Sequence, residues 1–190
     1  MNAAHSNTAT FKLHKTVVLV GMMGSGKTAI GRSVSAALGV AFRDSDYAIE
    51  EAAALTISEI FERDGEAFFR AREAEVIRRL LSLEPSILST GGGAFMNAKN
   101  REIIDKNGVS LWLNADLDTL WERVRHKDTR PLLRTDDPLG TLTGLFNDRV
   151  PTYAKSTLHV AISPDASIEE TTRMVIDALC ANPDILEVQP

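Results

Sequence analysis

The sequence contains a single cysteine, Cys180, so the chain has no partner for an internal disulfide bond. This suits a reducing compartment, and we expect a cytoplasmic protein. Apolar runs are short, and none approaches the ~20 residues that a membrane-spanning helix needs. Basic residues are outnumbered, with 21 Lys and Arg against 26 Asp and Glu. This balance argues against a nucleic acid or a membrane surface as the partner.

The two ends of the chain lack the patterns of folded structure. Residues 1–14 are small and polar and contain no acid, and they lack the apolar stretch of a secretory signal. We expect a flexible N-terminal tail there, with a short organelle-targeting remnant as the alternative, and a second loose tail at residues 182–190. Residues 15–181 fit a single domain of ordinary size, which we expect to be a monomer.

Between these ends, short apolar and β-branched segments alternate with helical patterns. The segments predicted as strands are residues 16–20, 40–43, 86–89, 109–113 and 158–162. Helices are predicted between them, with Pro151 as a kink or break in one of them. Five strands interleaved with helices predict an α/β fold of three layers, in which a five-stranded parallel sheet is flanked by helices.

A glycine-rich segment, residues 21–28, follows the first predicted strand and fits the pattern G-x-x-x-x-G-K-[ST]. Glycines let backbone N–H groups turn towards phosphate oxygens, and the following helix points its positive end at the same anion. Lys27 would reach the β- and γ-phosphates, and the Thr28 hydroxyl would bind Mg²⁺. The pattern predicts a P-loop NTPase fold that binds ATP through Gly24, Ser25, Gly26, Lys27, Thr28 and Ala29.

Two aspartates, Asp44 and Asp46, follow the second predicted strand. Ligands of such sheets bind beyond the carboxyl ends of the strands, which brings both aspartates near the phosphate loop. An aspartate there can hold Mg²⁺ through water, or accept a hydrogen bond from the attacking hydroxyl. The alternative is that Asp46 or Ser45 only caps the next helix.

Glu73 occupies a position on the apolar stripe of its predicted helix. A carboxylate turned towards a core is costly unless it is paired, and Arg70, one turn away, is the natural partner. Such a pair would hold the guanidinium rigid, ready to grip a carboxylate or hydroxyls. The alternative is an exposed ion pair that contributes a few tenths of a kcal/mol.

Three consecutive glycines, Gly91, Gly92 and Gly93, follow the third predicted strand. Such a run has a high entropic cost unless a ligand or another chain segment comes close, and a flexible loop is the alternative.

Basic residues gather between Arg123 and Arg134, in a segment without apolar periodicity. We expect a lid at about residues 125–138 that closes over the phosphates of ATP. Arg130 is a candidate to neutralise charge during phosphoryl transfer, and Arg149 is a further anion contact. For each arginine, a solvated surface charge is the alternative.

Together these segments resemble the shikimate kinase family. The resemblance covers residues 15–181 and rests on the linked motifs GMMGSGKT, DSD, GEAFFRARE, STGGG, TRPLL and DRVPTY. It implies transfer of the γ-phosphate of ATP to the 3-hydroxyl of shikimate, which gives shikimate 3-phosphate and ADP on the way to chorismate and the aromatic amino acids. It also implies a substrate-binding helical segment at about residues 46–82.

The resemblance further implies roles for individual residues. Asp46, Lys27 and Arg130 would be catalytic, Arg123 and Arg130 would contact the nucleotide, and Mg²⁺ would lie near Thr28 and Asp44. The implied shikimate contacts are Asp46, Phe61, Phe69, Arg70, Glu73, Gly91, Gly92, Gly93 and Arg149. Family members often carry an aspartate and a threonine after the last strand, where this chain has Val160-Ala-Ile-Ser163-Pro164. We expect backbone groups to replace those adenine contacts.

Two other functions fit parts of the pattern. One is a kinase of similar architecture that acts on gluconate or a nucleoside monophosphate, although Arg70, Glu73 and the glycine triplet favour shikimate. The other is a nucleotide-binding switch without transferase activity. A switch needs neither Asp46 nor the arginine cluster.

Overall fold

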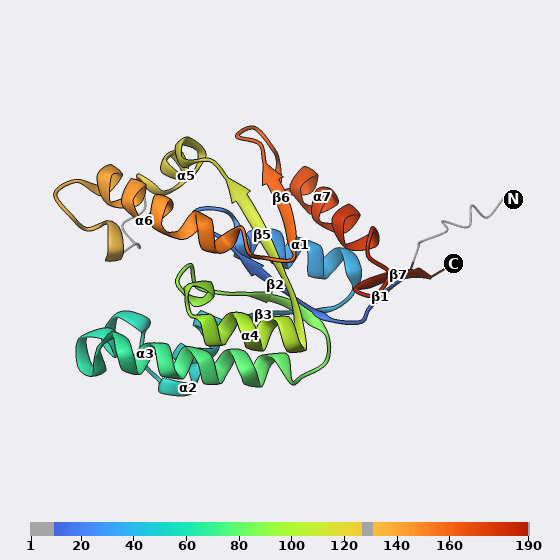
Figure 1. The fold of residues 1–190 in the computed structure, drawn as a ribbon, viewed down its shortest axis with the longest axis horizontal. Helices are drawn as coiled ribbons and strands as arrows, with labels where there is room; N and C mark the ends of the chain where they lie inside the picture. The colour runs from blue at the N-terminus through green and yellow to red at the C-terminus, as the bar shows by residue number, and fades with distance from the viewer. Residues whose placement is uncertain (1–9, 127–130, 190) are drawn as a thin grey trace, which may run out of the picture.

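A five-stranded parallel sheet forms the centre of the molecule, in a computed structural model that describes residues 10–126 and 131–189 (Figure 1). The strand order is β3-β4-β2-β5-β6. The strands are β2 (Thr16–Val20), β3 (Ala41–Asp44), β4 (Ser86–Ser89), β5 (Gly108–Ala115) and β6 (Leu158–Ile162). In the middle of the sheet, Val17 of β2 lies between Ile87 and Val109. The predicted α/β fold and its five strands are confirmed.

Helices cover both faces of this sheet. The helices α1 (Lys27–Leu38) and α7 (Ile168–Cys180) pack together on one face, and α4 (Ala98–Asn107) lies against β5 on the other. The remaining helical segments are α2 (Ser45–Ala53), α3 (Ile57–Leu81), α5 (Leu117–Val124), α6 (Pro138–Tyr153) and the 3-10 turns η1 (Ala94–Met96) and η2 (Pro131–Leu133). Among the described residues, no helix combines the length and the apolar character that a membrane crossing requires.

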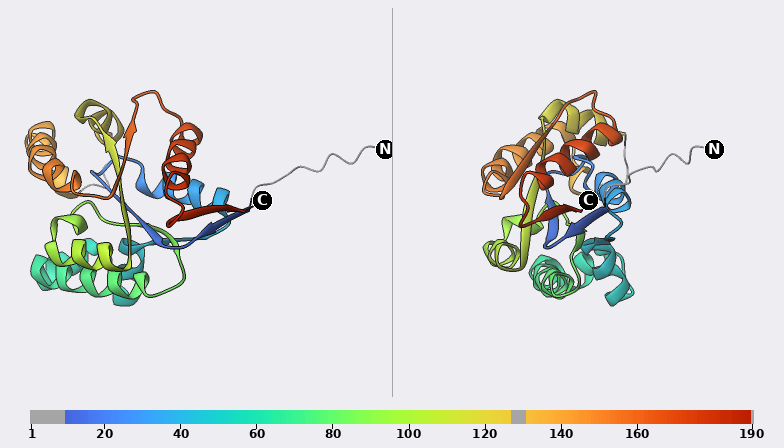
Figure 2. Two further views of the ribbon diagram at one scale, coloured as in Figure 1. Left: turned by 45° about the vertical axis from the view of Figure 1, so that its right-hand side comes forward. Right: turned by 90° about the vertical axis from the view of Figure 1, so that its right-hand side faces the viewer.

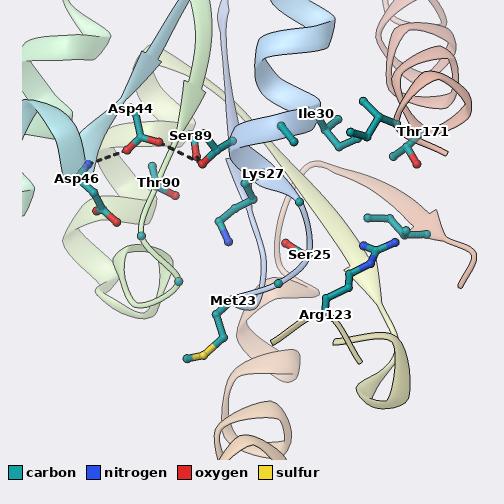
Figure 3. A pocket seen from close by; sticks show the side chains of 18 of the residues that line it. Met23, Ser25, Lys27, Ile30, Asp44, Asp46, Ser89, Thr90, Arg123 and Thr171 are labelled. Atoms are coloured by element: carbon teal, nitrogen blue, oxygen red, sulfur yellow. Dashed lines mark hydrogen bonds between the residues drawn. The ribbon is translucent and has the colours of Figure 1, made fainter. Parts of the chain in front are cut away.

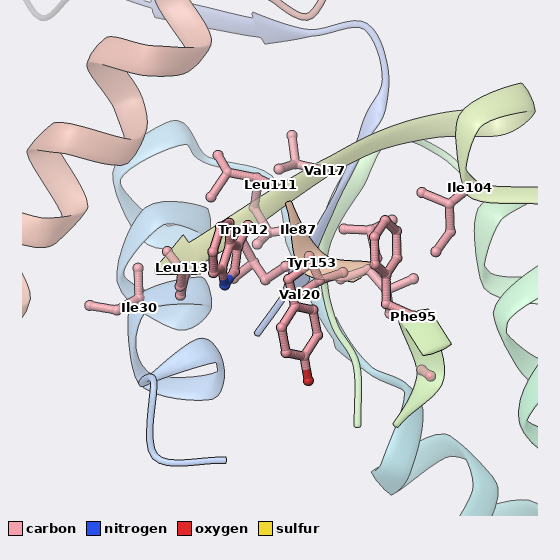
Figure 4. Packing of buried hydrophobic residues seen from close by; sticks show 14 of the residues in the cluster. Val17, Val20, Ile30, Ile87, Phe95, Ile104, Leu111, Trp112, Leu113 and Tyr153 are labelled. Carbon is pink, nitrogen blue, oxygen red and sulfur yellow. The ribbon is translucent and has the colours of Figure 1, made fainter. Parts of the chain in front are cut away.

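The core lies between the sheet and these helices. All five residues of β2 are buried, as expected for a central strand that is covered on both faces. Figure 4 shows side chains of β2, β4 and β5 packed with Phe95 of η1, Ile104 of α4 and Tyr153 at the end of α6. Tyr153 is among the largest side chains that are fully buried.

Helix boundaries follow the local sequence signals. Gly39 ends α1 in a left-handed conformation, and a capping box between Thr56 and Glu59 opens α3. Gly65, with φ of 79°, has a non-helical backbone conformation and interrupts α3. The helix α6 continues past Pro151 to Tyr153, so Pro151 does not end it.

The expectation of two loose tails is wrong where the structure describes them. The strands β1 (Thr10–Leu13) and β7 (Leu186–Gln189) form an antiparallel ribbon, which Figure 2 shows at the end of the molecule away from α6. Leu13 and Leu186 are buried, and this burial anchors the ribbon to the core. Residues 1–9 and 190 of the expected tails, and residues 127–130 of the expected lid with Arg130, lie outside the described residues.

The ribbon gives a prediction for stability. Leu186 is 1% exposed, whereas Val188 in the same strand is 50% exposed. We expect Leu186→Ala to lower the free energy of unfolding by about 2–4 kcal/mol, because it leaves a cavity, and Val188→Ala to change it by less than about 0.5 kcal/mol. Urea unfolding followed by circular dichroism measures both. Equal midpoints for the two variants would show that the ribbon lies outside the cooperative unit.

Candidate nucleotide and substrate site

The phosphate loop connects the end of β2 to the start of α1. Gly24 has φ of 83°, and a Cβ at this position would lie 2.7 Å from Val124 Cγ1 of α5, so the loop packs closely on that helix. The Lys27 ammonium donates hydrogen bonds to the carbonyl oxygens of Gly21, at 2.8 Å, and Met22, at 2.9 Å. The predicted phosphate ligand is therefore held inside the curve of the loop.

A cavity of about 480 Å³ opens in front of this loop. In Figure 3, Lys27 projects into its middle, with Asp46 on one side and Arg123 on the other. The lining residues from the loop and α1 are Met23, Gly24, Ser25, Gly26, Lys27, Thr28, Ala29 and Ile30. Those from elsewhere are Asp44, Asp46, Ser89, Thr90, Gly91, Gly92, Arg123, Ile162, Ala166, Ser167, Ile168 and Thr171. The cavity therefore runs from the predicted acceptor end to the predicted adenine end.

Three side-chain oxygens meet where α1, β3 and β4 come together. Thr28 Oγ1 donates to Asp44 Oδ2 at 3.3 Å and lies 3.4 Å from Ser89 Oγ. Among the residues described, no three His, Cys, Asp or Glu side chains gather to hold a metal by themselves. Mg²⁺ suits such a set of oxygen donors, because it is usually bound by one or two carboxylates together with phosphate oxygens.

The cap of α2 is Asp44, and the expected alternative that Asp46 or Ser45 caps this helix is wrong. The Asp44 carboxylate accepts hydrogen bonds from the backbone N–H groups of Asp46, at 3.0 Å, and Tyr47, at 3.4 Å. Because Asp44 satisfies these donors, the side chain of Asp46 is left available to the cavity.

Asp46 is half-buried, and its Oδ1 has no hydrogen-bond partner among the described residues. Burial, followed by the negative charge of Asp44, raises the pKa of Asp46 to about 6, although the Lys27 ammonium acts in the opposite direction. Glu50 adds to the rise. A carboxylate with this pKa is ionised at neutral pH and can accept a proton there.

Glu73 is buried and pairs with the partly exposed Arg70, so the alternative of an exposed surface ion pair is wrong. The Glu73 side chain is 1% exposed, and its Oε2 accepts a hydrogen bond from Arg70 Nη1 at 2.9 Å. Glu66 binds the same guanidinium at 3.3 Å. Burial raises the pKa of Glu73, while Arg70 acts against that rise. The two carboxylates fix the direction of the Arg70 guanidinium.

Two aromatic rings lie beside this pair. The ring centroids of Phe61 and Phe69 are 4.6 Å apart, and the Arg70 guanidinium lies 5.1 Å from the Phe69 centroid. These contacts bring the two predicted wall residues to the same place as the predicted carboxylate ligand.

The glycine triplet is where the predicted acceptor residues meet. A Cβ on Gly91 would lie 2.9 Å from Asp46 Oδ1, and one on Gly93 would lie 2.6 Å from Arg70 Nη2. A Cβ on Gly92 would lie 3.4 Å from Arg149 Nη1. Side chains from α2, α3 and α6 therefore converge on one loop, and the close approach of other chain segments explains the three glycines.

Sequence reasoning missed several lining residues, among them Ser89, which ends β4, and Thr90, which follows it directly before the triplet. Thr90 Oγ1 donates to the Leu19 carbonyl at 3.0 Å and ties this end of β4 to β2. The signal was their position, because ligands bind at the carboxyl ends of parallel strands.

At the other end of the cavity, the segment after β6 does line the predicted adenine side. Its two polar side chains have partners inside α7: Thr171 donates to the Ser167 carbonyl at 3.0 Å, and Ser167 accepts from the Glu170 N–H at 3.1 Å. The expected contact of the backbone of this segment with adenine stays a prediction.

Comparison with known proteins agrees with the site. Residues 23–180 match the family described as shikimate kinase. A shikimate kinase from Ruegeria pomeroyi is 59% identical over 93% of this chain and 90% of its own length. One from Cereibacter sphaeroides is 55% identical over 93% of this chain and 88% of its own length. The structure of a shikimate kinase from Acinetobacter baumannii in complex with shikimate superposes with a TM-score of 0.84, at 33% identity, and covers 88% of this chain and 94% of that one.

The raised pKa of Asp46 gives a prediction for stability. Between pH about 4 and 6 the folded state holds a proton that the unfolded chain, with a pKa of 3.8, releases. The free energy of unfolding therefore falls as the pH rises through this window. We expect Asp46→Asn, which has no charge to bury, to raise the melting temperature by about 2–5 °C at pH 7.5 and to leave it almost unchanged at pH 4. Thermal unfolding at both values checks this. A variant that melts at the wild-type temperature at pH 7.5 would contradict the cost assigned to the charge.

Proposed function

The chain belongs to the shikimate kinase family, and from this premise we propose how its residues transfer the γ-phosphate of ATP to the 3-hydroxyl of shikimate. The family's reaction is a phosphoryl transfer to an alcohol, with ATP as the co-substrate. The observation that carries the proposal is the convergence of Asp46, Arg70 and Arg149 on the glycine triplet, beside the phosphate loop.

At the acceptor end, Arg70 and Arg149 grip the carboxylate of shikimate. Planar guanidinium groups match a carboxylate in charge and in geometry, and Glu73 holds Arg70 in place for this task. Phe61 and Phe69 form the wall of this end. The hydroxyls of shikimate bind Asp46 and the backbone of Gly91, Gly92 and Gly93, with the Gly92 N–H as the main donor.

At the phosphate end, the backbone of the phosphate loop surrounds the β- and γ-phosphates. Lys27 exchanges its bonds to the loop carbonyls for bonds to these phosphates, and Arg123 stacks on adenine. Thr28 and Asp44, with Ser89 beside them, would hold Mg²⁺, which would supply positive charge to neutralise the phosphate oxygens. A lid that carries Arg130 remains a prediction, as do the monomeric state and the cytoplasmic location.

The reaction then needs no nucleophile on the enzyme. Asp46 accepts the proton of the 3-hydroxyl while the hydroxyl oxygen forms its bond to the γ-phosphorus and the bond to the ADP oxygen breaks. Most of the rate enhancement comes from holding two anions together in the right orientation, and from the positive groups that balance their charge.

Replacement of Asp46 tests this role. We expect Asp46→Asn to lower kcat with shikimate by at least ~100-fold, because the amide cannot accept the proton, while the Kd for ADP changes by less than about twofold. A coupled assay of ADP release and isothermal titration calorimetry measure the two quantities. Full activity of the variant would remove Asp46 from the mechanism.

Gluconate and nucleoside monophosphates serve as alternative acceptors, and turnover of either one without turnover of shikimate would overturn the proposed function.

The carboxylate clamp is tested with Arg70→Lys, because alanine at this position would leave the Glu73 charge buried and unpaired. Lysine keeps a positive charge but loses the planar fork, so we expect the KM for shikimate to rise by about 10–100-fold with little change in the KM for ATP.

Arg72→Lys is the matched control. Arg72 lies on the same helix and pairs with Glu75, and both side chains are about half exposed. We expect this variant to keep the wild-type constants. Equal effects of the two substitutions would show that Arg70 does not hold the substrate.

A further inference from the structure

Tyr153 is the last residue of α6, and the roles proposed so far do not use it. Its side chain is 0% exposed, and its ring stacks against Trp112 of β5 with centroids 6.1 Å apart. Figure 4 shows the ring among the apolar side chains of the core, with the hydroxyl at the edge of this cluster. A phenol whose ring is buried usually places its hydroxyl on a hydrogen-bond partner.

The Tyr153 hydroxyl lies between two groups of the proposed acceptor site. It donates a hydrogen bond to the Gly92 carbonyl at 2.5 Å, and a Cβ on Gly92 would lie 3.6 Å from the Tyr153 oxygen and 3.4 Å from Arg149 Nη1. A guanidinium can only donate, so the phenol oxygen can offer Arg149 its lone pairs while its proton goes to Gly92. Burial raises the pKa of Tyr153 to about 12, so the proton stays on the oxygen throughout the physiological range.

We propose that Tyr153 is a positioning residue that fixes the Gly92 peptide and the Arg149 guanidinium in the arrangement that binds the acceptor. The inference rests on the proposed function, since both partners act on shikimate there. One hydroxyl thus lies beside the guanidinium that binds the substrate carboxylate and holds the carbonyl of the residue whose N–H binds a substrate hydroxyl. A Cβ on Gly92 would also lie 3.6 Å from the Gly21 carbonyl, so the same peptide borders the phosphate loop.

The physical benefit is preorganisation. An arginine side chain has many rotamers, and a substrate that must select one of them loses affinity. The buried phenol restricts Arg149 before the substrate arrives, because its ring is held by the core packing and its oxygen has a fixed position. A phenylalanine here would fill the same space and would leave both partners without this restraint.

The test compares Tyr153→Phe with the matched control Thr172→Val. Thr172 is another buried residue whose hydroxyl donates to a carbonyl, that of Ile168 at 2.7 Å within α7. We expect Tyr153→Phe to raise the Kd and the KM for shikimate by about tenfold and to leave the Kd for ADP within twofold of the wild type. The control should keep the wild-type Kd and KM for shikimate even if its melting temperature falls as much as that of Tyr153→Phe. A Tyr153→Phe variant with the wild-type Kd, or a control with the same loss of affinity, would overturn the inference.

A double-mutant cycle separates positioning from general loosening of the fold. If Tyr153 acts through Arg149, then Tyr153→Phe should add less than about twofold to the Kd in the Arg149→Ala background. If the two substitutions raise the Kd for shikimate by factors that multiply in the double variant, Tyr153 does not act through Arg149. If the wild-type protein phosphorylates shikimate and Tyr153→Phe keeps the wild-type Kd and KM, only the role of Tyr153 is overturned. Wild-type protein that does not turn over shikimate defeats the proposed function.

A measurement on the free wild type covers the case in which Tyr153→Phe does not fold. The guanidinium N–H signals of Arg149, assigned by their loss in Arg149→Lys, should exchange slowly with water before any shikimate is added. Signals that become protected only after shikimate binds would show that the substrate orders Arg149, and would overturn the inference.

Discussion

The acceptor half of the site depends on the close contact between three charged side chains and one stretch of backbone. Asp46, Arg70 and Arg149 reach the triplet at Gly91, Gly92 and Gly93 only because these residues carry no Cβ. None of the three has a positive φ, so the sequence needs glycine there for space and not for an unusual backbone conformation. Any side chain at position 91 or 93 would displace the carboxylate or the guanidinium that faces it.

The same contacts withdraw charged groups from water, which is electrostatically unfavourable. Asp46 and Glu73 are carboxylates withdrawn from water, and burial opposes the charge of both. Arg70 compensates the charge of Glu73, but among the described residues Glu73 Oε1 and Asp46 Oδ1 both lack a hydrogen-bond partner. A fold tolerates such a group when surrounding packing supplies enough stability, and the buried strands around β2 do so here. This cost falls on Asp46, the residue that we propose takes up the hydroxyl proton.

Local signals predicted the nucleotide half of the site, because its strand, loop and helix are contiguous in sequence. The pairing of Glu73 with Arg70 was also predicted from a local signal, because a carboxylate on the apolar stripe of a helix needs a partner. The ribbon of β1 and β7 and the hydroxyl of Tyr153 could not be predicted in this way. Each depends on a contact between segments far apart in the chain, 61 positions between Tyr153 and Gly92. The strands of the ribbon alternate polar and apolar residues, but with four residues each they are too short for this alternation to predict a strand.

This difference has a structural cause. The phosphate loop lies at the end of the central strand, where one turn of backbone supplies most of the contacts that a triphosphate needs. An acceptor that differs from others in its hydroxyls and its carboxylate must be read by side chains from several directions, and here these come from α2, α3 and α6. Their common point is the backbone after β4, the strand that pairs with β2. Parallel pairing of β2 and β4 therefore sets the distance between donor and acceptor, since it fixes the two loops that follow these strands next to one another.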